Sequence, residues 1–143
     1  MNALVTGGAG YIGAHMVRAL GEAGHSVVVV DNLSSGHADA VPKGITFLRE
    51  DVSAQSTMTQ VLKDFRVDAV FHFASRIQVG ESVLDPRLYY RDNLAAAISL
   101  LESTLAAKVG TFVLSSTAAI YGNPLHTPIG CLLPADYLLI ISP

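Results

Sequence analysis

The chain has 143 residues, of which 50% are hydrophobic and 15% charged, with a mean hydropathy of +0.43 and a net charge of −3. This length corresponds to one domain, and the composition predicts a well-filled core and excludes an intrinsically disordered chain. The slight negative charge and the absence of a run of Lys and Arg disfavour nucleic acid as a partner.

The chain begins with a strand–helix–strand pattern around a glycine-rich turn. The spacing predicts a strand over residues 2–6, a helix over residues 11–23 that ends at Gly24, and a buried valine strand over residues 26–30. The turn, TGGAGYIG at residues 6–13, satisfies both GxGxxG and GxxGxxG. Glycines let a pyrophosphate approach the backbone, and the N-terminus of the following helix favours its negative charge. In this context the motif predicts dinucleotide binding.

Asp31 follows the second predicted strand, eighteen positions after Gly13. A carboxylate at this place can accept hydrogen bonds from both ribose hydroxyls of an adenosine, and it would repel a 2′-phosphate. Asp31 therefore favours NAD over NADP as the cofactor. The alternative interpretation is that Asp31 only begins a turn.

The remaining elements continue the alternation of strands and helices. Further strands are predicted over residues 45–48, 68–73 and 111–114, and further helices over residues 53–65, with Ser53 as N-cap, and 86–107. Strands separated by helices indicate a parallel sheet with right-handed crossovers. We therefore expect an α/β fold, a doubly wound parallel sheet of the Rossmann type that is incomplete, with about five strands and flanking helices.

The last part of the chain has a different character. Residues 123–143 contain four of the six prolines and the only cysteine, Cys131, and they end in an apolar run without helical periodicity. A single cysteine excludes an internal disulfide, and the five scattered histidines predict no metal site. No apolar run reaches the ~18 residues that span a bilayer, and the first strand begins directly after Met1 without a signal peptide, so we expect a cytoplasmic chain without membrane contact.

Seven spaced motifs resemble those of one family. TGGAGYIG, DNLSSG (31–36), EDV (50–52), FHFAS (71–75), VGES (79–82), YYRDN (89–93) and SSTAAIYG (115–122) occur in this order. Together they resemble the amino-terminal part of the extended short-chain dehydrogenase/reductases, and among these the UDP-glucose 4-epimerases. The resemblance covers residues 1 to about 129, which we expect to form a partial NAD-binding domain, followed by an aberrant apolar tail over residues 130–143 from a shifted reading frame.

The resemblance implies bound NAD, a UDP-sugar substrate and a homodimer. It implies that UDP-glucose and UDP-galactose interconvert through a transient 4-keto sugar. Tyr11 and Ile12 would contact the pyrophosphate through their amides, Asp51 would bind the adenine amino group, and Asn93 would stabilise the loop that supports the cofactor. The full set of expected cofactor-binding residues is Gly7, Gly10, Tyr11, Ile12, Gly13, Asp31, Asn32, Leu33, Ser34, Ser35, Gly36, Asp51, Val52, Phe73, Ala74, Ser75, Arg76, Ile77, Asn93 and Ser115.

The expected catalytic residues are only partly present. Thr117 follows the last predicted strand, where ligands bind in such sheets, and the resemblance implies that its hydroxyl bonds the 4-hydroxyl of the sugar. The family's YxxxK pair is absent, because no tyrosine of this sequence has lysine four positions later, and the carboxyl-terminal substrate lobe is absent too. We therefore expect this chain to be inactive. The alternatives are a nucleotide-sugar dehydratase relative, disfavoured by Ala118 and Ala119, and a non-catalytic NAD-binding module.

Overall fold

Five parallel strands form the sheet, as the sequence predicts. They are β1 (Asn2–Thr6), β2 (Ser26–Val30), β3 (Thr46–Leu48), β4 (Ala69–His72) and β5 (Thr111–Leu114), in the order β3-β2-β1-β4-β5. A two-residue strand, β6 (Ile140–Ile141), pairs antiparallel with β5 at the edge of the sheet. The computed structural model describes residues 1–116 and 140–141, so the expected tail lies largely outside the described residues.

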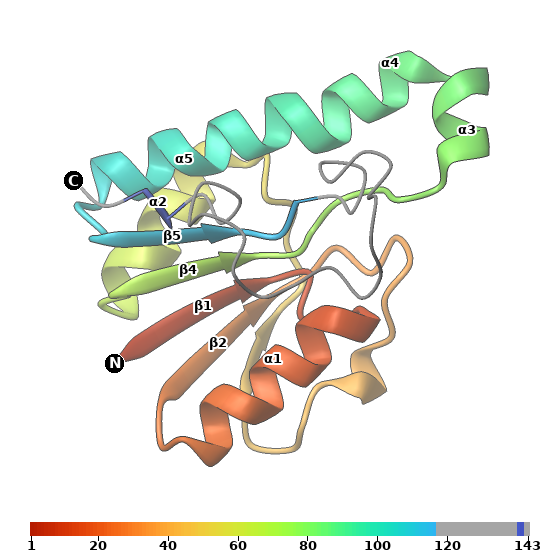
Figure 1. The fold of residues 1–143 in the computed structure, drawn as a ribbon. Helices are drawn as coiled ribbons and strands as arrows, with labels where there is room; N and C mark the ends of the chain where they lie inside the picture. The colour runs from red at the N-terminus through yellow and green to blue at the C-terminus, as the bar shows by residue number, and fades with distance from the viewer. Residues whose placement is uncertain (117–139, 142–143) are drawn as a thin grey trace, which may run out of the picture.

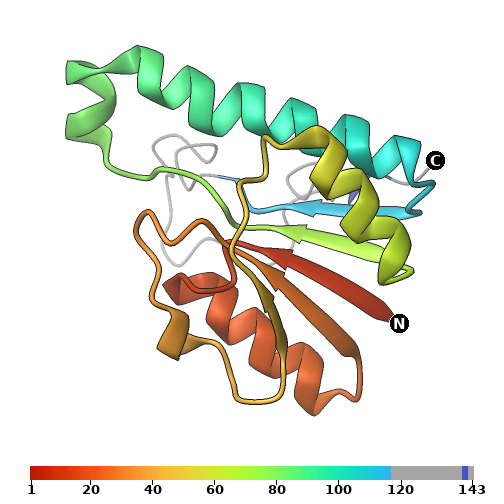
Figure 2. The same ribbon diagram turned by 180° about the vertical axis from the view of Figure 1, so that it is seen from behind.

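Helices cover both faces of the sheet. α1 (Tyr11–Glu22) lies on one face, and α2 (Gln55–Asp64) and α5 (Ala96–Ala106) lie side by side on the other (Figures 1 and 2). Alternate strand residues point to opposite faces, because successive side chains of a strand do so. Val5 and Val29 therefore pack with Val17 of α1, whereas Leu4 packs with Leu100 of α5. This two-sided burial confirms the doubly wound α/β prediction.

The start of α2 corrects one expectation. Ser53 is not the N-cap, because α2 begins at Gln55 after Ala54, and no side chain caps it. The Ser53 hydroxyl donates instead to Asp51 Oδ1 at 2.6 Å, and the Ser53 amide donates to the same oxygen at 2.9 Å. A serine that satisfies its hydroxyl on a preceding aspartate closes a local turn and is no longer available to the helix.

The helix expected over residues 86–107 is divided. It consists of α4 (Pro86–Tyr89), a π-helical turn η2 (Tyr90–Ala95) and α5, and a further short helix that the sequence did not predict, α3 (Val79–Leu84), precedes it. Asp85 separates α3 from α4 and accepts the amide of Leu88 at 3.2 Å, which makes it the N-cap of α4. A one-turn 3-10 helix, η1 (Ala38–Ala40), lies between β2 and β3.

We call α3, α4, η2 and α5 together the helical ridge. In Figure 1 it runs along the top of the sheet and extends past the carboxyl ends of the strands. It exposes several large apolar side chains, which are Val79, Val83, Leu84, Tyr90, Leu94, Ile98 and Leu105. Within the part of the chain that the structure describes, no helix is both long enough and apolar enough to cross a membrane.

Candidate functional site

The glycine turn joins β1 to α1 at the carboxyl edge of the sheet, and it is too tight for side chains. Gly7 has φ +71°, and a Cβ there would lie 2.6 Å from the backbone of Phe73 and of Ala74. A Cβ on Gly13 would lie 2.1 Å from the Gly7 carbonyl oxygen. Both distances are shorter than real Cβ contacts, so glycine is required at these two positions for packing alone.

The N-terminus of α1 is open toward this turn. Its N-cap, Gly10, has no side chain to accept the free amides, and no acidic residue lies in the first turn. The side chains of Tyr11 and Ile12 are 83% and 58% exposed, so they do not cover the helix end. Free N–H groups and the positive end of the helix dipole make this a place where an anion is stabilised.

Asp31 ends β2 and lies against the same turn. It is only 8% exposed, its Oδ2 accepts the Ala9 amide at 3.0 Å, and its Oδ1 accepts the Leu33 amide at 2.8 Å. The sequence predicts that this carboxylate accepts hydrogen bonds from both ribose hydroxyls, and in the structure each of its oxygens also accepts a backbone amide. Since a carboxylate has about four acceptor positions, the fixed Asp31 retains capacity for further donors.

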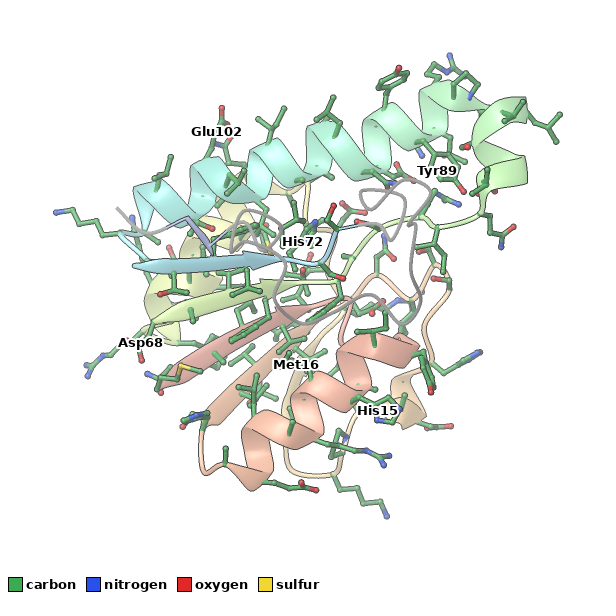
Figure 3. All side chains as sticks on the ribbon, viewed as in Figure 1. His15, Met16, Asp68, His72, Tyr89 and Glu102 are labelled. Carbon is green, nitrogen blue, oxygen red and sulfur yellow. The ribbon has the colours of Figure 1, made fainter. Side chains whose placement is uncertain are left out.

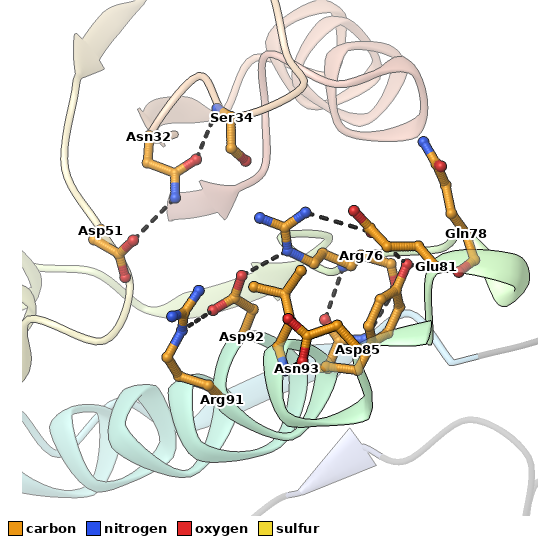
Figure 4. Close-up of polar contacts among 12 residues, drawn as sticks. Asn32, Ser34, Asp51, Arg76, Gln78, Glu81, Asp85, Arg91, Asp92 and Asn93 are labelled. Carbon is orange, nitrogen blue, oxygen red and sulfur yellow. Dashed lines mark hydrogen bonds and ion pairs between the residues drawn. The ribbon is translucent and has the colours of Figure 1, made fainter. Parts of the chain in front are cut away.

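A second carboxylate, Asp51, follows β3 and bonds the loop after β2. Asn32 Nδ2 donates to Asp51 Oδ2 at 2.9 Å, and Asn32 Oδ1 accepts the Ser34 amide at 2.9 Å (Figure 4). The hydrogen bond from the Ser53 side chain is the main cause that lowers the pKa of Asp51, so this carboxyl group is ionised at neutral pH. Three donors therefore fix Asp51 beside the Asn32 loop.

The loop after β2 also packs on the glycine turn. A Cβ on Gly36 would lie 2.8 Å from the carbonyl carbon of Ala9, and the His37 amide donates to the Ala9 oxygen at 3.0 Å. Leu33 takes a left-handed conformation with φ +60°, which is costly for a residue with a side chain. The residues expected to bind adenosine, from Asp31 to Gly36, are thus packed against the glycine turn that is expected to bind the pyrophosphate.

The loop after β4 is held by the helical ridge. Asn93 of η2 accepts the Arg76 amide on Oδ1 at 2.8 Å and donates from Nδ2 to the Arg76 carbonyl at 2.9 Å. Asn93 therefore bonds both polar groups of the Arg76 backbone. Ile77 is 86% exposed.

Three further residues that the sequence assigns to the site lie in different surroundings. Val52 is 8% exposed and belongs to the hydrophobic core, so its side chain packs inside the fold. Ser115 is exposed at the end of β5, and its amide donates to the carbonyl of His72 at 3.2 Å. Thr117, the expected catalytic residue, lies outside the described residues.

His72 is buried in the centre of the sheet and is 1% exposed. Its Nδ1 lies 2.7 Å from Thr6 Oγ1, and its Nε2 has no hydrogen-bond partner among the described residues. Burial lowers the pKa of His72 to about 4, so the imidazole is neutral at physiological pH. His72 is therefore a residue of the hydrophobic interior. In Figure 3 it lies between the sheet and the helical ridge.

Sequence reasoning missed three side chains near this site. Asp92, Glu81 and Tyr89 surround the loop after β4, and Tyr89 donates its hydroxyl to Glu81 Oε2 at 2.9 Å or to the Gln78 carbonyl at 2.7 Å. Their contacts span 5 to 16 positions of sequence and follow no period. The only available signal was that all three belong to the quoted VGES and YYRDN motifs.

Known proteins of one family are similar to this chain. The chain matches the NAD dependent epimerase/dehydratase family over residues 3–136. A UDP-glucose 4-epimerase of Azospirillum brasilense is 47% identical over 126 residues, which are 88% of this chain and 36% of that protein. A UDP-glucose 4-epimerase of Klebsiella pneumoniae is 39% identical over 135 residues, and the match covers 90% of this chain and 97% of that sequence.

Solved structures give the same result. A crystal structure of UDP-glucose-4-epimerase from Stenotrophomonas maltophila, with bound NAD and formylated UDP-arabinopyranose, superposes with a TM-score of 0.85 at 38% identity. The superposition covers 90% of this chain and 40% of that chain. The chain therefore spans well under half the length of the Azospirillum and Stenotrophomonas proteins.

Proposed function

Since this chain belongs to the NAD dependent epimerase/dehydratase family, we propose that it is the NAD-binding part of a UDP-glucose 4-epimerase. The glycine turn with the open N-terminus of α1 receives the pyrophosphate, and Asp31 receives the adenosine ribose. The observation that carries this proposal is the contact between them: the Asp31 carboxylate accepts the amide of Ala9 within the turn itself. The ribose and pyrophosphate positions are thereby fixed to one another.

Asp31 also sets the preference between the two nicotinamide cofactors. A buried carboxylate at the carboxyl end of β2 favours ribose hydroxyls and repels a 2′-phosphate. The loops that carry Asn32, Asp51 and Arg76 complete the site around the adenine and the second ribose. The sugar half of the reaction, with Thr117 at the 4-hydroxyl, is assigned by the family resemblance.

The 143-residue chain is inactive by itself in this proposal. No tyrosine in it is followed four positions later by lysine. In the family the tyrosine of this pair accepts the proton of the sugar hydroxyl, and NAD would supply the hydride acceptor when bound. Without the tyrosine the proton has no acceptor of matched pKa. A non-catalytic NAD-binding module is the second candidate, and the same missing pair favours it. Homodimer formation through the exposed apolar residues of the helical ridge also belongs to the proposal.

A cofactor titration with an activity assay tests the proposal. Calorimetric titration of the chain with NAD and with NADP should show binding that prefers NAD, and Asp31→Ala should weaken NAD binding and reduce that preference. Equal NAD affinity of the wild type and the variant would contradict the role of Asp31. Purified chain should not convert UDP-galactose, and measurable turnover would contradict the proposed inactivity.

A further inference from the structure

The side chain of Arg76 is fastened to the helical ridge by residues that the proposed function does not use. Its Nε donates to Asp92 Oδ2 at 2.6 Å, and its Nη1 lies 3.5 Å from Glu81 Oε2. The second oxygen of Asp92 accepts Arg91 Nε at 2.6 Å (Figure 4). We call Arg76, Asp92 and Asn93 the Arg76 clasp, because Asn93 bonds the backbone of the same arginine.

The π-helical turn η2 places both partners of the clasp. Asp92 and Asn93 are consecutive, and in an α-helix consecutive side chains diverge by about 100°. A π turn is wider and rotates less per residue, and such turns occur frequently at functional sites. In η2 one of the two residues takes the guanidinium of Arg76, and the other takes its amide and carbonyl. The whole of Arg76, side chain and backbone, is therefore held by two adjacent residues.

The clasp is connected directly to the glycine turn. Arg76 follows Ala74 by two residues, and the backbone of Phe73 and Ala74 forms the wall against which Gly7 packs. A displacement of Arg76 would move this wall and open or narrow the turn. Asp92 also lies close enough to Asp51 to act on it electrostatically, since its charge raises the pKa of that carboxyl group in opposition to the dominant Ser53 hydrogen bond.

We propose that Asp92 is a positioning residue for the dinucleotide, acting through Arg76 to fix the loop against which the glycine turn packs. This inference rests on the proposed NAD binding. For the change in NAD affinity when the charge of Asp92 is removed, it predicts the sign opposite to that expected from electrostatics alone. Removing a negative charge beside a site for two phosphates should strengthen binding by Coulomb's law. Loss of the clasp should weaken it.

The decisive measurement is NAD affinity of the full chain for Asp92→Asn and a matched control. The control, Glu102→Gln, also removes one negative charge from the helical ridge. Glu102 lies toward the end of the ridge opposite Tyr89 and accepts a hydrogen bond from Gln55 of α2 (Figure 3). We expect Asp92→Asn to weaken NAD binding about fivefold, the size that a partly exposed ion pair provides, and Glu102→Gln to change it less than about twofold. In an Arg76→Gln background, Asp92→Asn should have no further effect.

The outcomes separate this inference from the proposed function. One outcome overturns the positioning role alone. In it, the wild type binds NAD and Asp31→Ala weakens the binding, but Asp92→Asn leaves NAD affinity unchanged or raises it. The proposed function would then stand. An additional weakening by Asp92→Asn in the Arg76→Gln background would also overturn the positioning role, because Asp92 would then act by another route. Absence of NAD binding by the wild type would overturn both.

Hydrogen exchange of the cofactor-free chain gives a readout that does not depend on NAD. The Arg76 amide donates to Asn93 and should exchange faster in Asp92→Asn than in the wild type, with no change in Glu102→Gln. An unchanged exchange rate would show that Asp92 does not hold the loop.

Discussion

The glycine turn and the Arg76 clasp lie at the same edge of the sheet but are built in opposite ways. In the turn, backbone packs on backbone, and the absence of side chains is the structural requirement. In the clasp, charged and amide side chains from the helical ridge hold a loop 16 to 17 positions away in sequence. The turn is therefore held in shape by close packing of backbone on backbone. The clasp is held in shape by side-chain hydrogen bonds, which single substitutions can remove.

The largest expected effect is Gly13→Ala in the turn. The added Cβ would meet the Gly7 carbonyl oxygen at 2.1 Å, and backbone cannot move aside as a flexible side chain can. We expect a loss of about 3 kcal/mol in the free energy of unfolding, measured by urea denaturation, together with loss of NAD binding.

Gly21→Ala in the same helix is the matched control. A Cβ at Gly21 would meet no atom within 4 Å, so the substitution should raise stability by about 0.5–1 kcal/mol. Similar losses of unfolding free energy in the two variants would show that the lack of space for a Cβ does not determine the glycine at position 13. The contrast between the turn and the clasp would then fail.

The second prediction concerns His72, which joins the two regions. Its bond to Thr6 links β1, which enters the glycine turn, to β4, which enters the clasped loop. Because the pKa of His72 is lowered from 6.5 to about 4 by burial, the unfolded chain binds more protons between these values. Stability is therefore fully present above pH 6.5 and falls as the pH drops toward 4, by up to about 3 kcal/mol.

Urea denaturation between pH 7 and pH 4, for the wild type and His72→Gln, measures this effect. The variant should show a flatter dependence of unfolding free energy on pH in that window. Asp51 and Asp92, whose pKa values lie below the ordinary 3.8, begin to lose their contributions only near the acid end of this window. Both proteins contain these two groups, so the difference between their pH profiles reports on His72. Equal slopes for the two proteins would contradict a neutral buried His72.

The contrast also explains which parts could be predicted from the sequence. The five strands and the glycine turn were predictable, because burial and steric exclusion leave periodic apolar runs and fixed glycine spacings. The capping of α2 was predicted wrongly, because Ser53 bonds Asp51 and no local pattern shows which acceptor a serine chooses. The division of the long helix at η2 and the partners of Arg76 were missed, because they depend on contacts between distant side chains.

The smallest effects concern the ends of three helices, which share one geometry. α1, α2 and α5 each end in a Schellman motif, with a left-handed residue followed by an amide that bonds the carbonyl five positions earlier. In α1 the left-handed residue is Gly24, with φ +78°, and the sequence therefore predicted where this helix ends. In α2 and α5 it is Arg66 and Lys108, with φ +47° and +60°, so these ends carry no glycine signal.

Substitution at these positions tests whether the left-handed conformation alone sets the cost. Lys108→Gly should raise the free energy of unfolding by about 0.5–1 kcal/mol, because glycine takes positive φ without steric penalty, and Gly24→Ala should lower it by about 1 kcal/mol. Both positions are exposed at their helix ends, so packing changes little. Thermal and urea unfolding of the two variants measures the difference. A loss of stability in Lys108→Gly would show that the Lys108 side chain contributes more than its backbone strain costs, and the end of α5 would then be held, like the clasp, by side-chain contacts.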